Sequence, residues 1–163
     1  MLTIRPASLN DVPAITDIYN DAVLNTTATF DTEPKTVTEM NEWFLEHGLK
    51  YPIIVAEKEG VVSGWASLSQ WSPKKAYDTT AETSVYVNPA FHRQGIGRKL
   101  IEVITLEGQN KGFLNLFARI SEENIVSIHL FESLSYNSIG TMMKAGTKFG
   151  RLLNVVMLQR VFS

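Results

Sequence analysis

The strongest constraint on the fold is the stretch from Glu82 to Ile101, ETSVYVNPAFHRQGIGRKLI. Its first residues are mostly β-branched or aromatic, which favours a strand. An Asn88-Pro89 turn and a loop follow, and from Ile96 apolar residues recur at helical spacing. Gly95 and Gly97 stand at the entry of this predicted helix, where the first N–H groups lack intrahelical partners and the helix dipole favours an anion. The stretch therefore predicts a strand–loop–helix unit whose glycines let a diphosphate approach the backbone.

Two common phosphate-binding motifs do not fit this stretch. A Walker loop requires Gly-Lys-Ser/Thr at the helix start, whereas Gly97 is followed by Arg98-Lys99. A dinucleotide-binding fingerprint requires a third glycine, and Leu100 stands at that position. Two interpretations remain: a diphosphate-binding loop of another kind, or a turn in which the glycines only ease the passage from strand to helix.

Composition excludes several classes of protein. The 163 residues suit a single domain, residues 1–163, with a sizeable core. A net charge of −2 argues against a nucleic-acid-binding surface. Because the chain has no cysteine, it can form no disulfide, thiolate nucleophile or cysteine-ligated zinc site. The first residues carry charge and proline, and no apolar run approaches the ~18 residues of a membrane span, so we expect a cytoplasmic protein.

Hydrophobic periodicity predicts four helices and about seven strands. The helices are expected to begin after residue 8 or 10, after 36 or 38, at 96 and after 121 or 122, and to end near 24, 48, 111 and 134. The strands are expected at 2–5, in a hairpin within 51–71, and at 82–87, 113–120, 136–142 and 152–161. Segments 25–34 and 144–151 are predicted to be loops. Because strands and helices do not strictly alternate, we predict an α/β (α+β) fold, a mixed central sheet with helices on both faces.

The helix-entry motif resembles a known cofactor loop. His92-Arg93-Gln94-Gly95-Ile96-Gly97 is similar to the Gln/Arg-x-x-Gly-x-Gly/Ala loop with which GCN5-related N-acetyltransferases (GNAT) bind the pyrophosphate of coenzyme A. The predicted order of elements matches that family over nearly the whole chain. Further motifs resemble the branch that contains phosphinothricin and methionine sulfoximine/sulfone N-acetyltransferases. These motifs are Thr29-Phe30-Asp31-Thr32-Glu33-Pro34, Ala76-Tyr77, Thr80 to Val87, Asn124-x-x-Ser127, and Gly146 to Arg151 with Gln159.

The resemblance implies acetyl-CoA as co-substrate and assigns residues to it. The loop from Gln94 to Lys99 would hold the diphosphate through backbone N–H groups, and the strand edge at Val85 to Val87 would pair with the pantetheine amides. The N–H of Val87 or a neighbour would then polarise the thioester carbonyl. The complete set of implied cofactor contacts is Val85, Tyr86, Val87, Arg93, Gln94, Gly95, Ile96, Gly97, Arg98, Lys99, Asn124, Ser127 and Ser133.

The resemblance also names a catalytic base, Glu82, which would take the proton of the substrate ammonium directly or through water. The alternative is an ordinary carboxylate at a strand start. Many relatives have a tyrosine as general acid where this chain has Phe131, so Tyr86 or water remains for that role. The histidines, His47, His92 and His129, lie on different predicted elements without the spacing of metal ligands, so we predict no metal site.

Phe30, Lys74, Lys75, Tyr77 and Leu153 are implied to contact the substrate. Relatives usually grip the substrate carboxylate with an arginine in the loop before Ala-Tyr; the lysines here supply charge without the bidentate fork. Leucine at 153 removes a histidine donor found in phosphinothricin-selective relatives, which predicts a roomier, less polar site. A lone aromatic residue such as Phe30 can alternatively pack onto the core.

The predicted function is transfer of an acetyl group to the α-amino group of a small amino-acid-like molecule. The alternatives are protein or peptide N-acetylation, and a non-catalytic module that senses coenzyme A. The resemblance further implies a homodimer, with the terminal strands and segment 144–151 near the interface.

Overall fold

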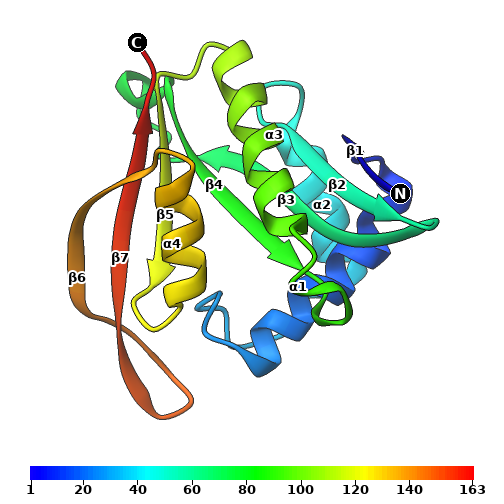
Figure 1. Ribbon diagram of the computed structural model, residues 1–163, viewed down its shortest axis with the longest axis horizontal. Helices are drawn as coiled ribbons and strands as arrows, with labels where there is room; N and C mark the ends of the chain where they lie inside the picture. Colours follow the sequence, from blue (N-terminus) through cyan, green and yellow to red (C-terminus); the bar gives the residue numbers. More distant parts are fainter.

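In the computed structural model, which describes residues 1–163, a seven-stranded sheet has the order β1-β2-β3-β4-β5-β7-β6 (Figure 1). All neighbouring strands are antiparallel except β4 and β5. The strands are β1 Leu2–Pro6, β2 Ile53–Lys58, β3 Val61–Gln70, β4 Thr80–Val87, β5 Asn115–Ser121, β6 Asn137–Lys148 and β7 Arg151–Val161. The helices are α1 Val12–Asn25, α2 Val37–His47, α3 Ile96–Asn110 and α4 Ile125–Ser133, with short 3-10 turns η1 Leu9–Asp11, η2 Lys75–Tyr77 and η3 Pro89–Phe91. The predicted mixed sheet of seven strands with four helices is therefore confirmed.

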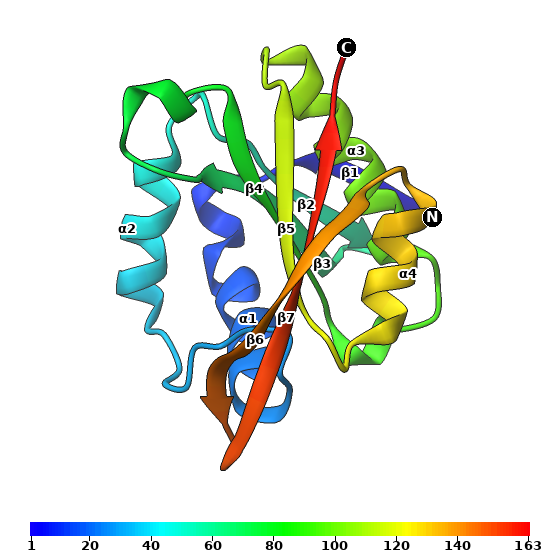
Figure 2. The ribbon, with the colours of Figure 1, turned by 90° about the vertical axis from the view of Figure 1, so that its left-hand side faces the viewer.

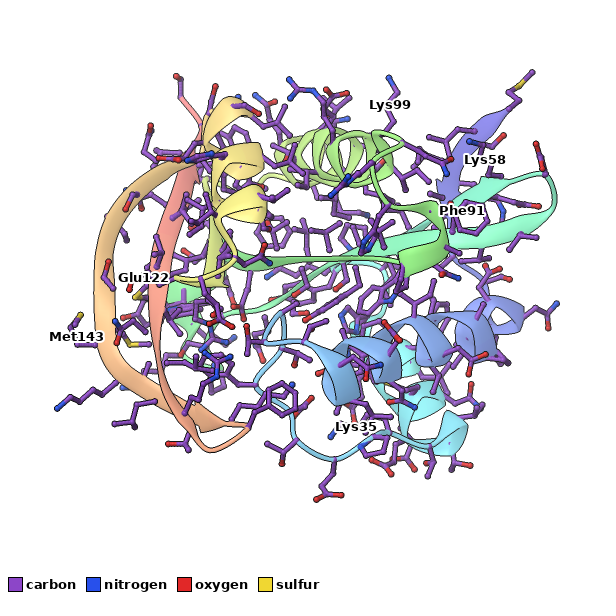
Figure 3. The ribbon with its side chains drawn as sticks, turned by 60° about the horizontal axis from the view of Figure 1, so that its bottom comes forward. Lys35, Lys58, Phe91, Lys99, Glu122 and Met143 are labelled. Atoms are coloured by element: carbon purple, nitrogen blue, oxygen red, sulfur yellow. The ribbon has the colours of Figure 1, made fainter.

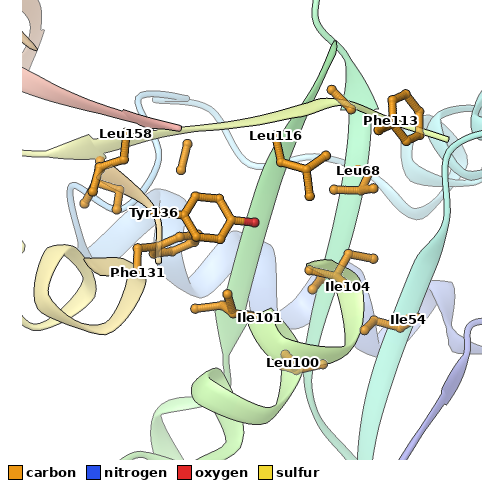
Figure 4. Close-up of a cluster of buried hydrophobic side chains, with 14 of the residues drawn as sticks. Ile54, Leu68, Leu100, Ile101, Ile104, Phe113, Leu116, Phe131, Tyr136 and Leu158 are labelled. Carbon is orange, nitrogen blue, oxygen red and sulfur yellow. The ribbon is translucent and has the colours of Figure 1, made fainter. Parts of the chain in front are cut away.

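The helices cover both faces of the sheet, α1 and α2 on one side and α3 and α4 on the other (Figure 2). Successive side chains of β3 point to opposite faces of the sheet and so contribute to both cores. Ala66 and Leu68 join the core under α3, whereas Trp65 joins the core under α1 and α2. Figure 4 shows Leu100, Ile101 and Ile104 of α3 in the larger of these cores. Because both faces are buried, β2 reads as a continuous apolar run, with Ile53 to Ala56 all buried.

Strands β4 and β5 separate part of the way along their length. Their parallel pairing covers only Thr80–Asn115, Ala81–Leu116 and Glu82–Phe117. Beyond that point β4 continues to Val87 and β5 to Ser121 without pairing, and Figure 1 shows the two strands diverging. The sheet therefore has an opening at its centre.

Most predicted element boundaries are confirmed. Thr36 caps α2, since its side chain accepts a hydrogen bond from the Glu39 N–H at 3.1 Å. Glu59 and Gly60 both have positive φ, 53° and 78°, as a tight two-residue hairpin turn requires. Gly112, with φ 91°, follows the end of α3.

Three local predictions are wrong. The N-cap of α1 is Asp11, not Ser8 or Asn10, because Ser8 caps the short η1 turn that precedes the helix. The N-cap of α4 is Asn124, not Ser121 or Glu122, because the Asn124 side chain accepts from the Ser127 N–H while Ser121 still belongs to β5. The predicted loop 144–151 is mostly strand: β6 runs on to Lys148. Irregular pairing between Met142 and Gly146 absorbs the extra residues as a bulge, and a two-residue turn at Phe149-Gly150 leads into β7.

Candidate active site

A cavity of about 390 Å³ lies where β4 and β5 separate. Residues 82–86 of β4 form one wall and residues 118–121 of β5 another. Residues 27–30, from the segment between α1 and α2, and side chains of α4 and β6 close it further. This volume is within the range of ~300–1,000 Å³ typical of small-ligand sites. The opening in the sheet thus contains a cavity of a size that suits a small ligand.

The exposed edge of β4 presents unpaired backbone groups to this opening. The Asn88 N–H donates to the carbonyl oxygen of Ser63 in β3 at 2.8 Å. The backbone N–H and C=O groups of alternate residues before Asn88 therefore also face β3. By the same alternation Thr83, Val85 and Val87 direct their N–H and C=O groups toward β5, beyond the point where β5 pairs. The His92 imidazole donates to the Val87 carbonyl at 3.1 Å, whereas the Val87 N–H faces the side on which β4 has no partner strand and has no acceptor there. An extended amide-containing ligand can add here as a strand.

The start of α3 is suited to a diphosphate. Gly95 is its N-cap in the left-handed conformation, φ 77°, and supplies no capping side chain. The N–H groups of Ile96, Gly97 and Arg98 have no hydrogen-bond acceptor in the chain. A Cβ on Gly97 would stand 3.5 Å from Leu130 and 3.6 Å from Val87, so this turn is packed between α4 and β4. Bare N–H groups at a helix dipole, in line with an open strand edge, fit the diphosphate and pantetheine of coenzyme A.

Charged side chains surround this loop without blocking it. Arg98 and Lys99 both pair with Glu102 one turn along α3, and Lys99 points into solvent (Figure 3). Arg93 is exposed at positive φ, 63°. The Gln94 side chain accepts a hydrogen bond from Lys58 of β2.

The polar residues expected on α4 divide between two places. Asn124 and Ser127 line the cavity, although the Asn124 amide oxygen also caps the helix. Ser133 lies at the other end of α4, outside the cavity lining, where its hydroxyl accepts from Arg98 at 3.0 Å and donates to Leu130 O.

Glu82 lies on the cavity wall in a bidentate ion pair that the sequence did not predict. Arg119 of β5 donates through Nε at 2.6 Å and through Nη2 at 2.8 Å to the two carboxylate oxygens. The Trp71 ring stacks on Phe117 at 4.7 Å and lies 5.5 Å from the guanidinium of Arg119. The hydrogen bonds that Arg119 donates to Glu82 raise the pKa of Arg119. A single cation within the apolar strand sequence LFARIS was the signal for Arg119.

Phe30, which the resemblance implies as a substrate contact, lines the cavity and is held by the β6–β7 hairpin. Its ring lies against the backbone of Gly146, where a Cβ would meet Cδ2 at 2.5 Å. Lys148, only 3% exposed, donates to the Thr29 carbonyl at 2.8 Å, and burial lowers its pKa. Tyr19 of α1 also holds this segment through Thr29 and Asp31. The cavity wall is therefore fixed by contacts from distant parts of the chain.

Phe131 stands at the position where many relatives have a tyrosine as general acid. Its ring is buried against Tyr136 (Figure 4). The Tyr136 hydroxyl is itself buried and bonded to Thr83 and Thr105. Tyr86 lines the cavity, and burial raises its pKa to about 12. Its ring also packs on Trp65 and Tyr19, so it has a structural role as well.

Other predicted residues lie outside the cavity. Lys74, Lys75 and Tyr77 are exposed on the η2 turn, and none lines the cavity or the groove of about 500 Å³ that adjoins it along Tyr19, Ser84 and Tyr86. Leu153 is buried in β7 opposite Gly146 and lines neither space.

The structure contains no group of three His, Cys, Asp or Glu side chains placed to hold a metal ion. No helix has the length and apolar character to cross a membrane.

Comparison with known proteins agrees with this geometry. Residues 4–157 match the family model of the acetyltransferase (GNAT) domain. The chain is 38% identical over 159 residues to an L-methionine sulfoximine/L-methionine sulfone acetyltransferase of Salmonella typhimurium, covering 97% of this chain and 93% of the relative. A Salmonella typhimurium protein solved with its cofactor acetyl-CoA superposes with a TM-score of 0.97 at 36% identity, covering 100% of this chain and 95% of the other. A phosphinothricin acetyltransferase from Sinorhizobium meliloti, solved with acetyl-CoA, gives 0.96 at 33% identity, covering 99% and 89%.

The chain belongs to the GNAT acetyltransferase family. It is an N-acetyltransferase that uses acetyl-CoA as the acetyl donor.

Proposed function

We propose that this enzyme acetylates the α-amino group of a small free amino acid of the methionine sulfone, methionine sulfoximine or phosphinothricin type. The observation that carries the proposal is the small cavity at the β4–β5 opening, closed on one side by Phe30 and its neighbours. A wall held in place by Lys148 and Gly146 leaves little room for a folded protein substrate. The related enzymes named above act on amino acids of this kind.

In this proposal acetyl-CoA supplies the acetyl group as a thioester, and the chain binds and orients it. The unpaired N–H groups of Ile96, Gly97 and Arg98 hold the diphosphate, with Arg93 and Gln94 beside them; the Lys99 N–H is already bonded to Gly95 O at 3.2 Å. The edge at Val85 to Val87, together with Asn124 and Ser127, receives the pantetheine arm. Ser133 acts from outside the cavity, by holding Arg98 at the cofactor loop.

Glu82 is the proposed base. Its carboxylate lines the cavity and is oriented by the ion pair with Arg119, where it can accept a proton from the substrate ammonium. The Val87 N–H, free at the strand edge, donates to the carbonyl oxygen under attack. Glu82 takes one proton from the ammonium, directly or through water, and passes it to solvent, which leaves a neutral amine. The amine nitrogen then attacks the thioester carbon, and the N–C bond forms as the C–S bond breaks. The second proton of the nitrogen leaves through water, and water protonates the departing thiolate.

We expect methionine sulfone to be acetylated with a higher kcat/KM than phosphinothricin. Glu82 and Arg119 are the only charged residues that line the cavity, and they already neutralise each other. The phosphinate of phosphinothricin would bring a second anion into a site with no second cation, whereas a sulfone is neutral. Thiol release measured with both compounds, with other free amino acids and with peptides tests the proposal. Faster acetylation of peptides than of any free amino acid would refute it, and an equal or higher kcat/KM for phosphinothricin would contradict the order of preference.

We also propose a homodimer that forms through the β6 edge. This outer strand exposes Ile139, Met142 and Met143, and Met143 projects from the molecular surface (Figure 3). Phe149 and Leu152 extend the apolar surface around the hairpin turn. An unpaired edge with exposed apolar side chains favours association. Light scattering at micromolar concentration should give twice the chain mass of 18.2 kDa, and a particle of 18.2 kDa would count against the dimer.

The location that we expect for this enzyme is the cytoplasm, since a chain without cysteine suits a reducing compartment.

A further inference from the structure

We propose that Arg119 binds the α-carboxylate of the substrate, so that the Glu82–Arg119 pair recognises a zwitterionic amino acid. This inference rests on the proposed function and specifies which feature of an amino acid the site requires. It assigns carboxylate recognition to a strand residue inside the cavity instead of to Lys74 and Lys75 on the η2 turn.

The guanidinium of Arg119 has an unused edge. Its Nε and Nη2 atoms donate to Glu82, while Nη1 has no acceptor in the chain. Arginine carries five N–H donors in a planar fork, so one edge can hold Glu82 while Nη1 and the second hydrogen of Nη2 hold another carboxylate. The Trp71 ring lies 5.5 Å from the guanidinium and limits its orientations. Arg119 is thus positioned by one carboxylate and remains open to a second.

No other cation is available to an acid in this cavity. Arg119 is the only cation that lines the cavity and Glu82 the only anion. Lys148, the nearest alternative on this wall, is buried, does not line the cavity and donates to the Thr29 carbonyl. An α-amino acid carries one ammonium and one carboxylate on the same carbon. It can therefore place the ammonium at Glu82 and the carboxylate at the Nη1 edge, and leave no charge in the cavity unpaired.

The test compares L-methionine sulfone with its α-carboxamide, which has the same amine and side chain but no carboxylate. The enzyme should prefer the acid. Arg119→Met should lower kcat/KM for the acid by on the order of 10- to 100-fold, the range for a lost hydrogen bond to a charged group, and change the amide far less. Arg119→Lys should restore part of the preference, because it keeps the charge but not the fork. Lys111→Met, which removes one exposed positive charge beyond α3, should leave both values unchanged.

Equal losses for acid and amide in Arg119→Met would mean that Arg119 acts only through Glu82, and the inference would be wrong. Loss of the acid preference in Lys74→Ala/Lys75→Ala with its retention in Arg119→Met would place carboxylate binding on the η2 turn, with the same consequence.

A binding experiment separates this inference from the proposed function. Calorimetric titration of the enzyme–coenzyme A complex with both compounds reads the acid preference without turnover. Because Arg119→Met leaves Glu82 free to repel the acid, the comparison is made between Glu82→Gln and Glu82→Gln/Arg119→Met. The acid preference should persist in the first and disappear in the second; its persistence in both would overturn the inference. If the compounds bind with this pattern but are not acetylated, the proposed function fails and the carboxylate site stands.

Discussion

Replacing Glu82 with glutamine is expected to lower kcat/KM by roughly 10²- to 10⁴-fold, the usual effect of losing an acid–base group. Glutamine keeps the shape of the side chain and can still accept one hydrogen bond from Arg119, so the fold and acetyl-CoA binding should be retained. The loss should shrink as pH rises, because a substrate amine that is already neutral needs no base. Thiol-release kinetics across pH, with acetyl-CoA binding measured by calorimetry, check both parts.

A matched control is Glu57→Gln. Glu57 also pairs with an arginine, Arg5, at 2.8 Å, but on β2, away from the cavity, so its removal should leave kcat/KM unchanged. Full activity in Glu82→Gln, or a wild-type rate that does not vary with pH, would remove Glu82 from the mechanism.

Valine at Gly95 or Gly97 is expected to abolish acetyl-CoA binding. At Gly95 a β-branched residue would have to adopt φ 77°, and its side chain would enter the open space over the helix start. At Gly97 the added methyl groups would meet Leu130 and Val87, which a Cβ alone already contacts. Calorimetric titration with acetyl-CoA measures the loss directly.

Gly112→Val provides the control for backbone strain. Gly112 has φ 91°, faces open space, and stands just beyond the other end of α3. This variant is expected to lose stability, as Gly95→Val is, yet to bind acetyl-CoA normally. Normal binding by both Gly95→Val and Gly97→Val would disprove the assignment of the cofactor loop.

The parts of the fold that local sequence determines were predictable. The β4–loop–α3 unit follows from residue types that favour a strand, a turn and an amphipathic helix in direct succession, and its boundaries agree with the structure. The same holds for Thr36 as a cap and for the Glu59-Gly60 turn, because each acts on residues next to it.

What could not be predicted depends on contacts between distant residues. Arg119 is a site residue because β5 pairs beside β4 and the two strands separate after Phe117, and the sequence of β5 alone does not indicate that pairing. Lys148 lies in a segment that the sequence predicts as a loop. In the structure it is buried, and its ammonium donates to the carbonyl of Thr29, 119 residues away in the chain. The β6 bulge likewise depends on β7, since nothing in KAGTKFGR by itself indicates where pairing resumes.

The three residue pairs between β4 and β5 have a consequence for how the domain holds together. The sheet consists of two blocks of continuously paired strands, β1-β2-β3-β4 and β5-β7-β6. The three residue pairs between β4 and β5 are the only backbone ladder that joins the two blocks. A ligand bound along the open edge of β4 would reach α3 and α4 as well, and so tie both blocks. Binding free energy would then oppose the relative opening of the two blocks, so we expect acetyl-CoA to stabilise the junction between them as well as its own binding site.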